Sequence, residues 1–190
     1  MYRRTLMTYA LRAASVLPFL RVRLEAAVTE LPAESVAALK DLAAIVLPSS
    51  LGRRRTDVIA VEFARWVREY RPGVPMDPGY GQPRLRNTPP SPADDYVAQL
   101  KALDSAARTQ GKPLARLGRE AQQKLVETAL TEAKVQILPQ RPTGQHVASD
   151  LMAFYFQSSE ANDYAYRAEI GRHKCRPLEV STKRPKPLEM

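Results

Sequence analysis

Two histidines and one cysteine are the side chains of this 190-residue chain that most readily support nucleophilic or metal chemistry. His173 and Cys175 are two residues apart in GRHKCRP, a spacing at which an imidazole could activate a thiol or both could ligate a metal. No third group accompanies them, and His146 lies in no recognisable nucleophile motif. Glycine-rich phosphate loops, H-E-x-x-H and C-x-x-C are missing as well. The sequence therefore predicts no catalytic, cofactor-binding or metal-ligating residue.

Cys175 is more informative as a single thiol. Basic side chains at 172, 174 and 176 would lower its pKa and favour the thiolate. In an oxidising compartment such a cysteine is a candidate for a disulfide with another chain, whereas in a reducing one it stays free. Both interpretations are open on the residues alone.

The net charge of +9 is concentrated at the two ends of the chain. Residues 1–23 carry five arginines and no acid, residues 167–190 carry seven bases and three acids, and residues 24–166 carry 17 of each sign. A helical nucleic-acid-binding protein is the alternative suggested by the high pI and by Arg53–Arg55. A formally neutral body argues against it, so we expect no nucleic-acid partner.

A second alternative is an independent enzyme whose site is assembled from scattered carboxylates such as Asp94, Asp95 and Asp150. Asp94 and Asp95 follow Ser91-Pro92-Ala93, so they are explained more simply as acids in the first turn of a helix.

The N-terminus is similar to a twin-arginine export signal. Arg3 and Arg4 are followed by one residue and then by the apolar pair Leu6 and Met7, ahead of a mildly apolar run. We assign residues 1–26 to this segment and 27–190 to a single domain. The alternative is a basic amphipathic helix that stays attached. The run is too short and too charged to cross a bilayer.

Helical spacing of apolar residues recurs through the rest of the chain, and no period-two pattern typical of strands is evident. We predict an all-α fold: a small irregular helical bundle with a long proline-rich loop at 71–92 and an extended basic C-terminal tail at 167–190. Loops of that length are uncommon unless functional or disordered, so 71–92 is either an arm on a partner or a linker.

Five helical segments are expected. One spans about 33–47, and the next follows a basic turn and begins near Thr56 or Asp57. A third carries Tyr96, Leu100, Leu103 and Ala107, a fourth carries Leu125, Ala129, Ala133 and Ile137, and the last starts near Thr143. The single tryptophan, Trp66, is interpreted as core.

Several short motifs in order resemble the gluconate 2-dehydrogenase subunit 3 family. They are the RR leader, LPAESVAALKDLAAIVLP, a helix with VEF, LKALDSAAR, GKPLARL and YRAEIGRHKCRPL, and together they run through nearly the whole chain. The family comprises small subunits of bacterial membrane-associated flavoprotein dehydrogenases.

This resemblance implies a non-catalytic accessory subunit without a cofactor of its own. The partner would be an FAD-dependent GMC-type dehydrogenase large subunit that oxidises a sugar or sugar acid, with a multihaem cytochrome c subunit as a further partner. The small subunit would assist maturation and twin-arginine export of the large one, which places it in the periplasm, at the inner membrane only through the complex. Arg3 and Arg4 would be read by the translocon, and Cys175 would have a partner chain and an oxidising compartment.

Overall fold

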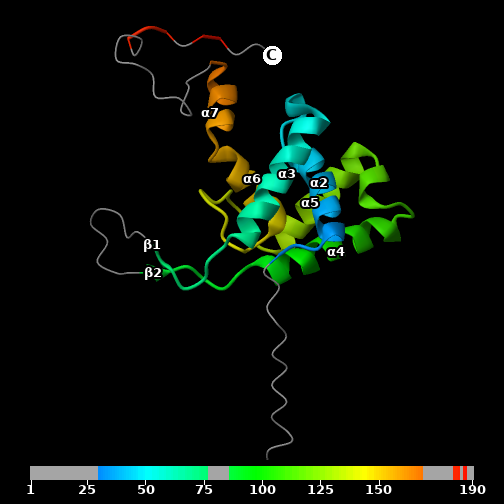
Figure 1. The fold of residues 1–190 in the computed structure, drawn as a ribbon. Coiled ribbons are helices and arrows are strands. Elements are labelled where there is room, and N and C mark those ends of the chain that lie inside the picture. The colour runs from blue at the N-terminus through cyan, green and yellow to red at the C-terminus, as the bar shows by residue number, and fades with distance from the viewer. Residues whose placement is uncertain (1–29, 77–85, 169–181, 185, 188–190) are drawn as a thin grey trace, which may run out of the picture.

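The computed structural model describes residues 30–76, 86–168, 182–184 and 186–187. Its described part contains six α-helices with almost no strand, which confirms the expected small all-α bundle (Figure 1). The helices are α2 (Ala33–Val46), α3 (Gly52–Arg68), α4 (Ala93–Thr109), α5 (Arg119–Glu132), α6 (Val147–Phe156) and α7 (Ser159–Tyr166). Two short 3-10 turns, η2 (Ser49–Leu51) and η3 (Leu114–Arg116), precede α3 and α5.

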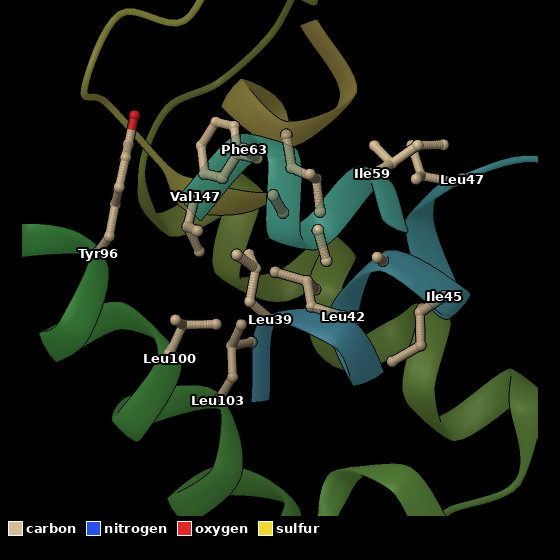
Figure 2. Packing of buried hydrophobic residues seen from close by; sticks show 14 of the residues in the cluster. Leu39, Leu42, Ile45, Leu47, Ile59, Phe63, Tyr96, Leu100, Leu103 and Val147 are labelled. Atoms are coloured by element: carbon tan, nitrogen blue, oxygen red, sulfur yellow. The ribbon is translucent and has the colours of Figure 1, made fainter. Parts of the chain in front are cut away.

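Helix α2 is the centre of the bundle, because it packs against α3, α4, α5 and α6. Its side chains Leu39 and Leu42 are completely buried. Figure 2 shows them between residues of α3 and α4, among them Ile59 and Leu100. The helix begins after Pro32 and ends before Pro48, as the sequence predicts, because proline is compatible with the start of a helix and stops its continuation.

The apolar stripe expected on α4 is also observed. Its four residues Tyr96, Leu100, Leu103 and Ala107 are all buried, and the helix carries two acids in its first turn. Burying one large apolar side chain contributes about 1.5–3 kcal/mol, so this stripe fixes α4 firmly on α2.

The start of α3 differs from the prediction. Arg53–Arg55 do not form the basic turn expected before the helix but lie in the first turns of the helix itself, which begins at Gly52. Neither Thr56 nor Asp57 is its N-cap, and the Thr56 hydroxyl instead donates to the carbonyl of Arg53 at 2.9 Å. Positive charge is unfavourable at a helix N-terminus, and here nearby carboxylates compensate for it.

Helix α5 is shorter than its apolar pattern predicted. It ends at Glu132, and Ile137, which was placed on its apolar face, is 84% exposed. The chain leaves the helix through Lys134, whose φ is +56°, with Val135 N–H donating to the carbonyl of Leu130. This is a Schellman termination, and it ends the helix before the proline at 139.

The last predicted helix is two helices. It starts at Val147, not near Thr143, and ends at Phe156, after which α7 begins a second, separate helix. Tyr155 is buried, whereas Phe156 and Tyr166 are exposed. In Figure 1, α7 extends from α6 away from α4.

The described parts of the proline-rich segment pair with each other and with Tyr70, just beyond the end of α3. Strand β1 (Pro75–Met76) pairs antiparallel with β2 (Arg86–Asn87), and the Tyr70 hydroxyl donates to the carbonyl of Pro89 at 3.2 Å. In the basic tail, Ala168 forms a single antiparallel bridge with Pro187. Residues 77–85, and most of the tail, lie outside the described residues, so the predicted arm and tail are tested only in part.

Candidate functional site

The site residues predicted from the sequence lie outside the described residues. These are the export pair Arg3 and Arg4, the apolar positions Leu6 and Met7, and Cys175 with its neighbour His173. Their roles stay predictions, and the candidate site must be built from the described body.

The arginine triplet is engaged by carboxylates. Arg53 contacts Asp41 at 2.7 Å and Asp57 at 3.0 Å. Arg55 holds Glu160 of α7 in a bidentate pair, with its Nε at 2.7 Å from Oε1. The hydrogen bond to Glu160 is the main reason why the pKa of Arg55 is raised. Two of the three guanidinium groups therefore join helices to one another, which weakens the case for Arg53–Arg55 as a nucleic-acid-binding triplet.

The three carboxylates of the scattered-acid hypothesis occupy different environments. Asp94 and Asp95 are exposed in the first turn of α4, whereas Asp150 on α6 is completely buried. A general acid or base must reach the reacting proton, and Asp150 has no exposed surface. This arrangement does not favour an active site built from these three acids.

Asp150 instead organises a buried hydrogen-bond network. Its Oδ1 accepts from the backbone N–H of Thr143 at 2.9 Å and from the Thr143 hydroxyl at 3.2 Å. Its Oδ2 accepts from the Tyr96 hydroxyl and from the backbone N–H of Gly144, both at 2.7 Å. Burial and the negative charge of Asp150 raise the pKa of Tyr96, so its hydroxyl stays a donor. The network fixes the loop before α6 to α4.

Glycine is favoured at position 144 of that loop for two reasons. Its φ is +87°, in the left-handed region that glycine adopts without strain, and a Cβ there would lie 3.3 Å from the Cβ of Pro92. A larger residue at this position would be strained and would crowd Pro92.

An aromatic pocket lies directly beside this network, and we take it as the candidate functional site. The aromatic pocket is a cavity of about 700 Å³ between the end of α3, the β1–β2 hairpin and the loop at 141–143. Trp66 and Tyr70 form its aromatic wall, and Arg71 and Arg141 supply positive charge. A smaller cavity of about 230 Å³ adjoins it and shares Trp66, Tyr70, Pro89, Pro142 and Thr143 with it.

The aromatic wall is held in place by ring contacts. Trp66 stacks on Phe63 with centroids 5.5 Å apart and an interplanar angle of 24°, and it meets Tyr70 edge-on at 5.5 Å. Phe63 is fully buried and also contacts Phe154 of α6. The wall is thus an outward extension of the core, and Trp66 belongs to both the core and the pocket.

Sequence reasoning missed this pocket. The signal available was the spacing of Trp66 and Tyr70, which lie four residues apart on one helical face immediately before the proline-rich segment. Arg141 and the loop around it are about 70 residues away in sequence, and long-range contacts such as the Asp150 network and the hydrogen bond from Gln157 to Gln140 bring them to the pocket.

The chemistry that the aromatic pocket offers is binding. Its wall presents aromatic faces, two guanidinium groups, hydroxyls and the carboxylate of Glu69, a combination suited to the mixed polar and aromatic surface of a protein. No group of three or more potential His, Cys, Asp or Glu metal ligands occurs within the described ranges. Within those ranges, no single helix is long and apolar enough to cross a membrane. Helix α2 and residues 49–68 together have the length and apolar composition of a span, but the chain bends by 115° between them.

Comparison of the chain with protein-family models, with curated proteins and with solved structures gives no match.

Proposed function

We propose that this chain is the non-catalytic small subunit of a periplasmic flavoprotein dehydrogenase complex. It would bind an FAD-dependent GMC-type large subunit, assist its maturation, and carry it through the twin-arginine route. The proposal takes its partner and compartment from the resemblance of the sequence motifs to the gluconate 2-dehydrogenase subunit 3 family. The aromatic pocket is the structural observation that supports a binding role.

The composition of the aromatic pocket is that of a protein interface. Tryptophan, tyrosine and arginine dominate the binding energy of protein complexes, and Trp66, Tyr70, Arg71 and Arg141 all line this one cavity. Its volume of about 700 Å³ accommodates several side chains of a partner loop. Arg71 and Arg141 are exposed and have no ion-pair partner among the described residues, so they are available to acids on the partner.

The pocket is formed before any partner arrives. The Asp150 network holds its Thr143 edge, and ring contacts with Phe63 hold its Trp66 wall. A preformed site avoids the entropic cost of ordering loops on binding, which increases affinity for a given contact area.

Exposed apolar side chains adjoin the same side of the body. The Gln157 side chain lines the aromatic pocket and donates to the carbonyl of Gln140, which brings the end of α6 to the loop after α5. That loop exposes Ile137, and the end of α6 exposes half of Phe156. Covering Ile137 by a large subunit would contribute about 1.5–3 kcal/mol, and covering the half-exposed Phe156 about half as much.

The electron-transfer cofactors would then belong to the other subunits, FAD to the large subunit and haem c to a cytochrome. Membrane association would occur through the complex, and the described body would supply binding energy alone. Cys175 would form an interchain disulfide in this arrangement.

The test is to isolate the tagged full chain from the periplasm of its native host without reductant and to identify co-purifying proteins by mass spectrometry. We expect a stoichiometric flavoprotein with the absorbance of FAD, a chain processed near Ala26, and a Cys175-dependent shift on a non-reducing gel. A chain that stays in the cytoplasm without a flavoprotein would overturn the proposal.

Charge reversals then test the aromatic pocket itself. Arg71→Glu combined with Arg141→Glu should reduce recovery of the flavoprotein at least tenfold, because the substitutions replace attraction by repulsion at exposed positions. Arg116→Glu combined with Arg119→Glu reverses two exposed arginines outside the pocket; this double variant is the matched control and should recover the flavoprotein normally. Equal loss with both proteins would show that net charge, and not the pocket, determines binding.

A further inference from the structure

The aromatic pocket and the smaller cavity beside it form a combined binding site, which we call the aromatic trough. The two cavities have volumes of about 700 and 230 Å³, and both are lined by Trp66 and Tyr70. A molecule that lies on these two rings can therefore extend into each cavity. The combined site suits an extended segment better than a single side chain.

Many backbone positions of the aromatic trough offer no N–H to a ligand. The N–H of Thr88 donates to the carbonyl of Val74 at 2.8 Å. Those of Thr143 and Gly144 donate to Asp150 at 2.9 and 2.7 Å. Four further lining residues are prolines, which have no N–H: Pro89, Pro90, Pro92 and Pro142. This wall is therefore poorly suited to holding a peptide as an added β-strand, because that mode depends on main-chain hydrogen bonds.

Several side-chain donors of the aromatic trough are also bonded within the protein. The Tyr70 hydroxyl donates to the carbonyl of Pro89 at 3.2 Å, and the Thr88 hydroxyl donates to the carbonyl of Arg71 at 2.6 Å. The Gln157 amide donates to the loop after α5. These bonds fix the shape of the wall and leave their donors unavailable to a ligand.

Three side chains of the aromatic trough keep donors for a ligand. The indole N–H of Trp66 and the guanidinium groups of Arg71 and Arg141 have no acceptor among the residues that the structure describes. Both arginines are exposed. The lining also includes the carboxylates of Glu69 and Asp95, and Glu69 lies 4.0 Å from a neighbouring guanidinium. The site therefore favours a ligand with acceptor oxygens and a limited negative charge, whereas a polyanion such as nucleic acid would meet two carboxylates.

We propose that the aromatic trough binds an extended, acidic, proline-rich segment of the large subunit. Its proline rings pack on Trp66 and Tyr70, and its carboxylates pair with Arg71 and Arg141. Proline matches this wall because it offers a carbonyl acceptor and brings no N–H that would need a partner. A proline-rich segment is also extended as polyproline II before it binds, so aromatic-lined grooves recognise it at low entropic cost. The identity of the partner rests on the proposed function, whereas the chemistry of the segment does not.

The test uses the purified full chain and synthetic peptides, with the fluorescence of Trp66, the single tryptophan, as the readout. The probe is acetyl-PPEPPEPP-amide, in which glutamates three residues apart lie on one face of a polyproline II helix. We expect a saturable change in emission with a dissociation constant on the order of 0.1 mM. Acetyl-PPKPPKPP-amide has the opposite charge and acetyl-GGEGGEGG-amide has no proline rings, and each should bind about tenfold more weakly.

A charge swap tests the contact with the two arginines. Arg71→Glu combined with Arg141→Glu should weaken binding of the acidic peptide about tenfold and strengthen binding of the lysine peptide by a similar factor. Both positions are exposed, so the substitutions should leave the fold intact. Arg116→Glu combined with Arg119→Glu produces the same net charge outside the trough, and this control should keep the wild-type preference for the acidic peptide.

Any of four results would overturn the inference. One is the absence of a saturable change in Trp66 emission with the acidic peptide. Another is equal affinity of the wild-type chain for the acidic peptide and for either of the other two. A third is a charge-swapped chain that still prefers the acidic peptide. The last is a short oligothymidylate that competes with the acidic peptide and binds more tightly, because the trough would then be a site for single-stranded nucleic acid.

The result is separable from that of the proposed function. Peptide binding is measured on the chain alone, whereas the subunit role is measured by co-purification of a flavoprotein. A chain that co-purifies with a flavoprotein but binds no acidic peptide would overturn this inference only. A chain that binds the acidic peptide at Trp66 but has no flavoprotein partner would overturn the subunit proposal and leave the chemistry of the segment standing.

Discussion

The hydroxyl of Tyr96 on α4 donates to Oδ2 of Asp150 on α6 at 2.7 Å, and both side chains are completely shielded from solvent. The two residues are 54 positions apart. This bond joins α4 to α6. Asp150 also accepts from the backbone of Thr143 and Gly144, and so holds one edge of the aromatic pocket. A buried carboxylate with four donors thus connects the core to the candidate site.

The first prediction concerns that carboxylate. Asp150→Asn should lower the free energy of unfolding by about 2–4 kcal/mol, because an amide NH₂ would face backbone donors and leave buried groups unpaired. Tyr96→Phe should cost about 1–2 kcal/mol, since it removes one of the four donors. Urea denaturation of both single variants and of the double variant would measure their coupling, and additive losses would contradict a shared network.

The second prediction concerns the pH dependence of stability. The folded-state pKa of His146 lies below its ordinary value of 6.5, chiefly because burial disfavours the imidazolium, with Asp150 opposing that shift. Below about pH 6.5 the unfolded chain binds a proton that the folded chain does not. The free energy of unfolding therefore decreases as the pH is lowered from about 6.5 to the folded-state pKa. Asp150 on α6 and Glu132 on α5 are the charged groups to consider around the ring.

His146→Asn isolates this contribution. Its unfolding free energy, measured by urea titration between pH 5 and 8, should fall less steeply below pH 6.5 than that of the wild-type chain. Identical slopes for the two proteins would show that the pKa of His146 is not lowered in the folded state.

The third prediction concerns the end of α5. Lys134 adopts φ +56° at the position of a Schellman motif where glycine is preferred, because the left-handed conformation is strained for residues with a Cβ. Lys134→Gly should therefore stabilise the protein by about 0.5–1 kcal/mol, as measured by thermal and urea unfolding. Lys124→Gly, inside the same helix, is the control: glycine there should lower the free energy of unfolding by about 1 kcal/mol.

The fourth prediction concerns the attachment of α7. Glu160→Gln preserves the shape of the side chain but removes the charge that Arg55 binds. Because both side chains are about one third exposed, the loss in global stability should be only about 0.5–1 kcal/mol. Amide hydrogen exchange should accelerate in α7 and stay unchanged in α4, whereas uniform acceleration would mean that α7 opens only with the whole bundle.

The sequence was a good guide where one periodic face meets the core. The α4 stripe and the bounds of α2 follow from apolar spacing and from flanking prolines, and both are observed. The sequence was a poor guide where contacts between residues distant in sequence determine the local structure. The arginines that looked like a turn are helical and are held by Asp41 and Glu160.

The other failures have the same kind of cause. The apolar pattern continues to Ile137, but the helix ends at Glu132. Apolar spacing alone carries no information about where the helix terminates. The candidate site was missed because its edge at Thr143 depends on Asp150, a residue that the sequence offered as a catalytic acid and that the fold buries as a structural acceptor.

The central position of α2 has a consequence for synthesis. α2 is the first described helix to leave the ribosome, yet it packs against α6, which is complete only at Phe156. Until Phe156 has emerged, the face of α2 that holds Leu39 and Leu42 lacks part of its cover and is open to other apolar surfaces. A chaperone or a larger partner that binds the chain during synthesis would therefore first contact apolar residues that are later buried in the core.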